Sequence, residues 1–320
     1  MSVVVPVRNR RELLRSLLDA LDAQTFRDFE VIIVDDGSTD GSGEWAETAT
    51  VADTPVRVLR RAQIGAVRAR DEGVTEARGD ILAFTDSDCM PSSTWLETGV
   101  EAIDGGAAMV HGRTTPARPP RPRERTVMAE DDGLFATCNV FYRRDVFDAA
   151  GGFAHADAEH LSYRVSAPAR ALGFGEDTLL GWRVKRSGVD VRYVPDAVVH
   201  HHVFAPELSD RLHRALMAAA FPGLVREVPE LRERLVRRGV LFGSRTRVPM
   251  YAMAAALVLR RRRLAFLTAG WWAFARFREL HTTSVPLGEL ICAVPEEMLI
   301  DVVTAVALIA GGIRSRLVLL

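Results

Sequence analysis

The chain has 320 residues, 48% of them apolar, which is enough to bury one large core or one core with an appendage. A formal net charge of −1 argues against nucleic acid as a partner, because no overall positive field would attract it. The three cysteines, Cys89, Cys138 and Cys292, lack metal-ligand spacing and cannot all pair, so a reducing, cytoplasmic compartment is expected.

Short β-branched runs alternate with helical stretches through the first third of the chain. The first run follows Met1 directly, without the basic segment and long apolar stretch of a secretory signal, so no such signal is expected. The expected strands are 3–7, 30–34, 56–59 and 80–85, and the expected helices are 10–23 and 64–77. Thr39 or Asp40 is expected to cap a further helix. This order predicts an α/β fold with a mostly parallel sheet and a ligand crevice at the carboxyl ends of its strands.

The following residues, up to about 203, continue the same domain with a less regular pattern. The expected segments are a helix at 92–103, a strand at 107–111, an irregular loop rich in proline and arginine at 113–125, a strand at 137–141, a helix from Glu176 to just before Gly188, and strands at 191–194 and 197–199. We therefore expect one domain over residues 1–203.

Residues 204–320 differ in character, because arginine-rich stretches there alternate with apolar helical runs. The apolar runs 250–259, 264–277 and 298–313 are each shorter than the roughly 20 residues that a spanning helix needs, and Asp301 interrupts the last. Two interpretations stay open for this helical region. It lies on or dips into a membrane interface, at the inner face of the plasma membrane, or it packs against the first domain or a second subunit as a homodimer.

The motif Asp86-Ser87-Asp88 follows the apolar strand 80–85. Two carboxylates that leave a strand two residues apart can project to one side, and carboxylate oxygens are the ligands that Mg²⁺ and Mn²⁺ prefer. The alternative is a solvated turn, or a cap for the helix that begins near Ser92. The position of the pair beside a second acidic loop, 35–40, favours a metal site.

Several motifs in fixed order resemble family 2 glycosyltransferases with the GT-A fold. The motifs are Val5-Pro6-Val7-Arg8-Asn9, Gln24-Thr25-Phe26, residues 31–42 with Asp35-Asp36-Gly37-Ser38, Gly65–Gly73 with Arg70, Gly79–Asp88, Asn139 with Arg143-Arg144, Gly151-Gly152-Phe153, Gly175-Glu176-Asp177 and Ala197–His201. The resemblance spans residues 2 to about 203. It implies a nucleotide-sugar-binding half at 1–112, an acceptor half at 113–203 and a context in cell-envelope glycan biosynthesis.

The resemblance also implies how the donor is held. The nucleotide-sugar-binding residues it implies are Pro6, Val7, Arg8, Asp35, Asp36, Arg68, Arg70, Asp86 and Ser87. Asp36 would read the nucleobase or ribose, although an Asx turn is the alternative for this residue. Asp88, with Asp86 and His201, would bind Mn²⁺ or Mg²⁺, and which of His200, His201 and His202 contacts the metal stays open.

Inversion at an anomeric carbon requires a base that takes a proton from the acceptor hydroxyl. The resemblance assigns this role to Asp177, with Glu176 shaping the acceptor pocket. The alternative is that Asp177 only stabilises the positive end of a helix, a contribution of roughly 0.3–1 kcal/mol. Three departures from the family pattern are Asp71, where asparagine is frequent, Cys89, where an acidic residue is frequent, and the long polar link 155–174.

The favoured function is thus an inverting hexosyltransferase that moves a sugar from a nucleoside-diphosphate donor, UDP favoured, to a hydroxyl of a glycan, lipid or small molecule. One alternative is another metal-dependent nucleotide enzyme such as a nucleotidyltransferase, but residues 7–11 lack the glycine-rich loop that would hold a triphosphate. A second alternative is a non-catalytic glycan-binding protein. A processive polysaccharide synthase is disfavoured, because neither several long apolar helices nor a Gln-x-x-Arg-Trp motif is present.

Overall fold

The computed structural model describes residues 1–121, 123–155, 174–237, 246–281 and 287–317. The chain forms two compact units. The first comprises Met1–Pro119 and Thr126–Phe204, and the second comprises Pro120–Arg125 and Ala205–Leu320. Most of the long polar link expected between residues 155 and 174 lies outside the described residues.

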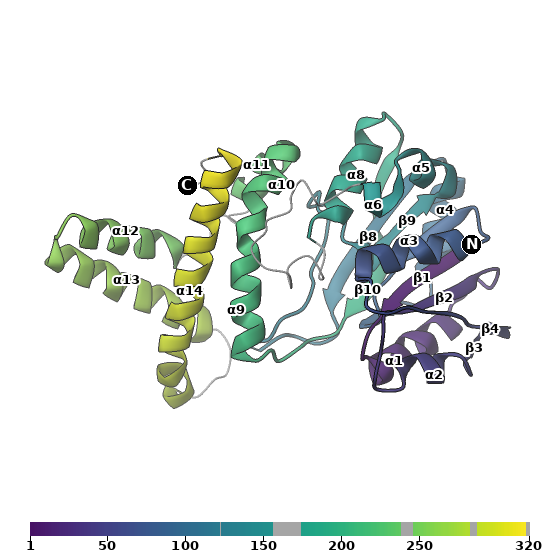
Figure 1. Ribbon diagram of the computed structural model, residues 1–320, viewed down its shortest axis with the longest axis horizontal. Helices are drawn as coiled ribbons and strands as arrows, with labels where there is room; N and C mark the ends of the chain where they lie inside the picture. The colour runs from purple at the N-terminus through teal and green to yellow at the C-terminus, as the bar shows by residue number, and fades with distance from the viewer. Residues whose placement is uncertain (122, 156–173, 238–245, 282–286, 318–320) are drawn as a thin grey trace. The chain divides into compact units, whose positions relative to one another are not determined.

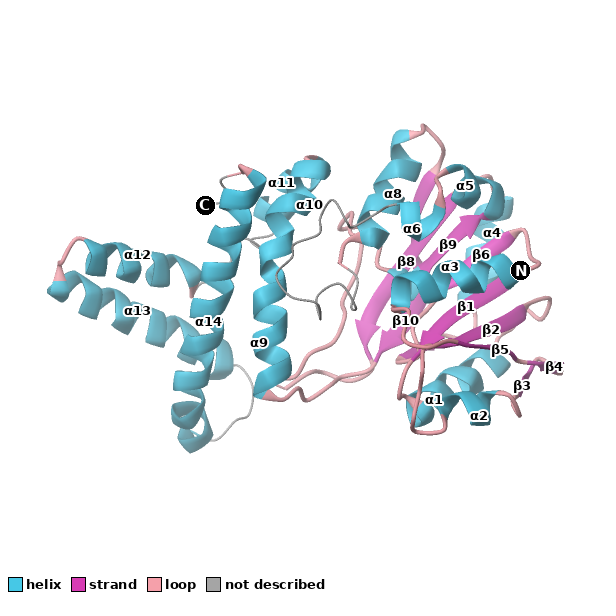
Figure 2. Ribbon diagram, viewed as in Figure 1, coloured by secondary structure: helices cyan, strands magenta, loops and turns pink. Residues whose placement is uncertain are grey.

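The first unit is built on a mixed eight-stranded sheet in the order β5-β2-β1-β6-β9-β8-β10-β7 (Figure 2). The strands are β1 (Ser2–Val7), β2 (Glu30–Asp35), β5 (Arg57–Arg60), β6 (Ile81–Phe84), β7 (Cys89–Pro91), β8 (Met109–Pro116), β9 (Val140–Arg143) and β10 (Val191–His201), and a separate small sheet pairs β3 (Thr50–Val51) with β4 (Thr54–Pro55). Strands β5, β2, β1 and β6 are parallel neighbours, as are β8 and β10. The pairings of β9 with β6 and β8, and of β7 with β10, are antiparallel.

Helices cover both faces of this sheet, as Figure 1 shows for α3. They are α1 (Arg11–Asp22), α2 (Ser42–Ala46), α3 (Ala66–Glu76), α4 (Trp95–Asp104), α5 (Arg144–Ala149), α6 (Gly152–His155) and α8 (Glu176–Arg186). Alternate residues of the buried strand β1 serve the two faces, since Val3 and Val5 join the cluster that contains the leucines of α1, whereas Val4 faces α3. A Cβ on Gly73 of α3 would lie 2.4 Å from Val4, so this glycine allows the close approach that carries Arg70 to the sheet.

Four local expectations were wrong in detail. Residues 137–141 are not one strand, because a 3-10 turn, η1 (Thr137–Asn139), precedes β9 while the Asn139 amide binds Trp95, Arg113 and Ala197 in the core. The loop expected from residue 113 begins only after Pro116, because β10 pairs with β8 that far. The two strands expected at 191–199 are one strand with an irregularity between Val194 and Val198. The residue at the N-cap of α2 is Gly41, in a left-handed conformation, while Asp40 accepts the Ser42 N–H.

The second unit is helical, as expected. Its elements are α9 (Leu208–Met217), η2 (Ala218–Ala220), α10 (Phe221–Glu227), α11 (Glu230–Arg237), α12 (Arg247–Val258), α13 (Arg262–His281) and α14 (Leu287–Ser315). Helices α12 and α13 lie side by side as a hairpin (Figure 1), and α14 contacts α9, η2 and α10.

Two of the three apolar helices are longer than expected, because α13 has 20 residues and α14 has 29, whereas α12, with 12, is short as expected. Asp301 does not interrupt α14, because its carboxylate accepts hydrogen bonds from Trp272 Nε1 at 2.9 Å and Arg276 Nη2 at 2.5 Å. Among the described residues, the segment Ala293–Ser315 of α14 is, by length and composition, apolar enough to cross a membrane. About a third of its most apolar stretch is buried within the protein, and core helices of soluble proteins can be equally long and apolar.

Candidate active site

Three parallel strands deliver the acidic loops to one edge of the sheet. Strands β2, β1 and β6 are adjacent, and Val7 of β1 pairs with Asp35 at the end of β2. The Asp86-Ser87-Asp88 motif follows β6 at the same edge, where the carbonyl of Asp86 accepts the N–H of Cys89 at 3.0 Å. Ser87 is buried in this turn.

The two aspartates of the first acidic loop are buried and have different contacts. Asp35 accepts the N–H of Ser38 at 3.0 Å and forms an ion pair with Arg60 at 3.4 Å, so its carboxylate faces the loop and β5. The carboxylate of Asp36 accepts the backbone N–H groups of Ile64 and Gly65 at 2.5 and 3.0 Å, which ties the loop before α3 to the end of β2. These contacts replace the Asx turn considered for Asp36, and each oxygen keeps a lone pair for a ligand.

The other residues implied for the nucleotide differ in exposure. Pro6 and Val7 are buried in β1, whereas Arg8, just beyond the strand, is exposed. On α3, Arg68 is exposed, whereas Arg70 faces the sheet and is only 5% exposed. Of the two arginines on α3, Arg70 is therefore the one placed to contact the acidic residues at the edge of the sheet.

Arg70 contacts carboxylates from two separate elements. Its Nη2 donates to Asp86 Oδ1 at 2.6 Å, and its Nη1 lies 3.9 Å from Glu176 Oε1 on α8. Burial alone would lower the pKa of Arg70, but the charges of Asp86 and Glu176 more than offset it and raise that pKa. The neighbouring Asp71 stands where asparagine is frequent in the family. Its carboxylate accepts the N–H of Phe153 at 3.0 Å and so holds the start of α6.

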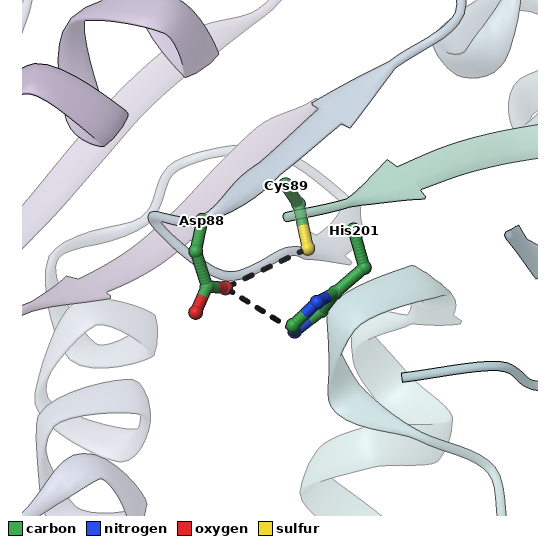
Figure 3. A group of neighbouring side chains, drawn as sticks. All are labelled: Asp88, Cys89 and His201. Atoms are coloured by element: carbon green, nitrogen blue, oxygen red, sulfur yellow. Dashed lines mark hydrogen bonds and ion pairs between the residues drawn. The ribbon is translucent and has the colours of Figure 1, made fainter. Parts of the chain in front are cut away.

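Asp88, Cys89 and His201 converge where β7 pairs with β10 (Figure 3). One potential ligand atom from each residue lies within 4.8 Å of the other two. Asp88 Oδ1 is 3.5 Å from His201 Nε2 and 3.9 Å from Cys89 Sγ. Burial, followed by the charge of Asp86, raises the pKa of Asp88, so this carboxylate lies where added positive charge would stabilise it.

The three consecutive histidines have different surroundings. His201 is buried beside Asp88, whereas His200 is exposed and contacts Thr115 through Nδ1 at 3.0 Å. His202 is partly exposed and stacks edge-on against Phe204, and burial lowers its pKa. Because side chains alternate along a strand, the direction of His201 toward Asp88 directs its neighbour His200 to the other side.

These donors fit a divalent cation such as Mn²⁺ or Mg²⁺. His201 Nδ1 lies 2.8 Å from the carbonyl of His202, which can only accept, so this contact favours a proton on Nδ1 and leaves Nε2 to present a lone pair to a cation. That lone pair faces the Asp88 carboxylate, and two acceptors at this distance need a cation or a proton between them. The Cys89 thiol is a weaker candidate, because a hydrogen bond with Cys138 and burial raise its pKa well above its ordinary value.

Glu176 and Asp177 open helix α8 behind the left-handed Gly175. Burial, followed by the charge of Asp177, raises the pKa of Glu176 to about 7. Asp177 is partly exposed, but loss of solvent around its carboxylate raises its pKa to about 6 despite a hydrogen bond from the Thr178 N–H at 2.7 Å. A helix start alone would lower the pKa of Asp177, so desolvation outweighs the helix end here.

Two residues of this site were missed in the sequence. Thr126 Oγ1 lies 3.2 Å from His201 Nδ1 and also contacts the His201 carbonyl, so it helps to orient the imidazole. Arg10 stacks on Phe204 at 4.5 Å and its charge acts on Asp88. The basic run 8–11 could have pointed to Arg10 as a site residue, whereas no pattern in the sequence around Thr126 distinguishes it.

The mixed sheet flanked by helices, with acidic loops at one edge, is the architecture of GT-A glycosyltransferases. Residues 2–162 match the family described as "Glycosyl transferase family 2", and the chain belongs to this family. The fold class and family expected from the sequence are thus confirmed, as is the class of enzyme at the level of the family. Membership in this family removes the nucleotidyltransferase alternative.

Relatives and solved structures agree with this assignment. The chain is 32% identical to glycosyltransferase AglE of Haloferax volcanii over 197 residues, which are 56% of this chain and 65% of AglE. It is 26% identical to the putative glycosyltransferase EpsH of Bacillus subtilis over 224 residues, 60% of this chain and 63% of EpsH. The chain therefore spans less than two thirds of each of these relatives.

Two solved structures share the fold at low identity. The mannosyltransferase PcManGT from Pyrobaculum calidifontis, in complex with GDP-Man and Mn²⁺, has a TM-score of 0.53 and 19% identity, with 98% of this chain and 86% of that chain covered. TarS 1-349 of S. aureus in complex with UDP-GlcNAc has a TM-score of 0.51 and 17% identity, covering 99% and 92%.

Proposed function

We propose that the chain is an inverting glycosyltransferase that moves a sugar from a nucleoside-diphosphate donor to an acceptor hydroxyl. The observation that carries this proposal is the contact of Arg70 with both Asp86 and Glu176. Through this one guanidinium, the acidic motif after β6 and the acidic start of α8 lie next to each other. A transferase needs these two groups together, because the donor and the attacking hydroxyl must meet in one place.

On the donor side, Asp36, with Asp35, Pro6, Val7 and Arg8 around it, receives the nucleoside in this proposal, and Asp86 with Ser87 faces the ribose or sugar. Arg70, and Arg68 at the rim, supply positive charge for phosphate oxygens. Mn²⁺ or Mg²⁺ would be held by Asp88, His201 and Asp86, and such an ion supplies charge that stabilises the departing diphosphate.

On the acceptor side, Asp177 is the general base. Its raised pKa of about 6 keeps the carboxylate ionised at neutral pH and still basic enough to take a proton as the hydroxyl attacks. Glu176, buried beside Arg70, orients the acceptor and holds the guanidinium. Attack from the side opposite the diphosphate inverts the anomeric carbon.

For the donor we propose UDP-sugars first, since TarS 1-349 binds UDP-GlcNAc, with GDP-sugars as the alternative that PcManGT suggests. The acceptor class is a glycan, lipid or small molecule. We place the enzyme on the cytoplasmic side, with the helical unit as its contact with the inner face of the membrane.

The test is nucleotide release from UDP-, GDP- and dTDP-sugars with Mn²⁺, for the full chain and for Asp88→Ala and Asp177→Asn. Metal-dependent release from one donor, lost in both variants, supports the proposal. Asp104→Asn, at an exposed aspartate on α4, is the matched control and should release nucleotide like the wild type. Equal turnover in all four proteins would contradict the assigned roles.

A further inference from the structure

The hairpin of α12 and α13 in the helical unit ends in a compact turn that exposes four consecutive arginines, Arg260–Arg263. The N–H of Arg260 donates to the carbonyl of Leu257 at 3.0 Å and that of Arg261 to Ala256 at 2.8 Å, which together define a Schellman motif. Arg260 occupies its left-handed position with φ +54°, where glycine is the usual residue. The turn therefore does not need an arginine there for its geometry.

The outward side of α13 carries large apolar side chains at helical spacing. They are Leu264, Leu267, Trp271, Phe274 and Phe277, with Phe266 beside them. The exposed fractions are 81% for Phe266 and 68% for Leu267. The inward side carries Ala265, Thr268, Trp272 and Ala275, of which Trp272 packs with Met250 and Ala305. This pattern is the reverse of a helix whose largest apolar residues fill a core.

Exposed apolar residues also lie on the other side of the turn. Leu257, Val258 and Leu259 at the end of α12 are all exposed, and Val258 is 82% exposed. Residues 247–278 contain seven arginines and no acidic residue. An exposed apolar face whose tip is purely cationic is complementary to a surface that combines hydrocarbon with negative charge.

We propose that this hairpin face, residues 257–278, docks on a lipid bilayer that contains anionic lipids. The aromatic and aliphatic side chains of α13 enter the interfacial layer, and Arg260–Arg263 contact the headgroups. Helix α12 has 12 residues, or about 18 Å at 1.5 Å per residue, which is shorter than the roughly 30 Å hydrocarbon core. The hairpin therefore lies in the interfacial layer and does not span the bilayer. A second copy docked in parallel through the same face would bring the two arginine clusters together. Repulsion between their like charges opposes that arrangement.

The first experiment is flotation of the full chain with vesicles of phosphatidylcholine alone and of phosphatidylcholine mixed with phosphatidylglycerol. We expect binding to the anionic vesicles that weakens as salt rises, because salt shortens the range of the arginine contribution. Equal binding to both vesicle types, or none to either, would overturn the proposal. This inference rests on the membrane contact proposed above for the helical unit; because the readout needs no turnover, its failure would remove that contact and leave the proposed sugar transfer untouched.

Variants locate the contact. Arg260→Gly removes one charge and relieves the left-handed backbone, so we expect unchanged or higher thermal stability with about fivefold weaker vesicle binding. Arg260→Gln/Arg261→Gln/Arg262→Gln/Arg263→Gln should weaken binding by nearly three orders of magnitude. The charge-matched control replaces four exposed arginines outside the hairpin, Arg15, Arg27, Arg226 and Arg232, and should bind like the wild type.

The apolar contribution is tested with Phe266→Ser/Leu267→Ser, which changes only exposed side chains and should abolish flotation while the fold is kept. Trp271 is half exposed, so vesicle binding should shift tryptophan emission to shorter wavelength, and Trp271→Phe should remove that shift. Hairpin variants that float like the wild type would overturn the proposal. So would a dimer in light scattering that dissociates in Phe266→Ser/Leu267→Ser without any binding to anionic vesicles, since the occupant would then be a second copy.

Discussion

Arg70 Nη2 donates to Asp86 Oδ1 over 2.6 Å, and this contact joins helix α3 to the acidic motif that follows β6. Arg70 is buried, whereas the Asp86 side chain is 28% exposed, so the carboxylate can still meet a ligand while the guanidinium holds it in place. The position of the Asp86 carboxylate is therefore set by the packing of α3 on the sheet.

Replacing Arg70 tests this dependence. Arg70→Gln leaves Asp86 and Glu176 without their common cation, so we expect a loss of about 2–3 kcal/mol in unfolding free energy and a fall in kcat/KM of about 100-fold or more. Denaturant unfolding and nucleotide release measure the two effects. Arg68→Gln, an exposed arginine on the same helix, should change stability by less than about 0.5 kcal/mol. Wild-type turnover in Arg70→Gln would remove Arg70 from the site.

The pH dependence of turnover tests Asp177 as the base. A general base must be deprotonated, so kcat/KM should fall as pH drops through about 6, the raised pKa of Asp177, and reach a plateau above it. Glu176, with its higher pKa of about 7, is largely protonated where Asp177 titrates, so Glu176→Gln should leave this inflection near pH 6. A profile that stays flat between about pH 5 and pH 8 would argue against this base.

The same pKa shift predicts a stability effect of the opposite sign from that of activity. Asp177 has an ordinary pKa of 3.8 and a pKa of about 6 in the fold, so the folded chain binds the proton more tightly and loses stability as pH rises from about 4 to about 6. Above that window the ionised group costs on the order of 1–2 kcal/mol, after allowance for its partial exposure. Asp177→Asn should therefore melt a few degrees higher than the wild type near pH 8, with the difference vanishing near pH 4. A variant that is less stable near pH 8 would show that the carboxylate is net stabilising.

Mn²⁺ titrations distinguish the histidines. His201→Ala should raise the Mn²⁺ concentration for half-maximal activity by about 10–100-fold, because Nε2 is a ligand candidate beside Asp88, and Thr126→Val should give a smaller increase by loosening the ring. His200→Ala, an exposed position on the other side of β10, should leave the titration unchanged. Binding of free Mn²⁺ followed by electron paramagnetic resonance checks the result without turnover; equal affinities in His200→Ala and His201→Ala would contradict the site.

Much of the first unit could be predicted because its signals are local. The alternation of β-branched runs with the leucine periodicity of α1 predicts a parallel sheet, and the end of each strand marks where polar residues collect. The errors occurred where a distant contact decides the local structure. The strand expected at residue 137 begins only at Val140, because the Asn139 side chain bonds to three separate parts of the core.

The sequence alone determined the order of motifs, the family and the strand ends that carry Asp36 and Asp88, because each depends on neighbours in the chain. Only the tertiary structure decided which histidine meets Asp88, since that depends on the register in which His201 of β10 pairs with Cys89 of β7. It likewise decided that Arg70 serves two carboxylates and that the larger apolar side of α13 faces outward. Both sides of α13 carry apolar residues, so only the packing of Trp272 against Met250 and Ala305 reveals which side is buried.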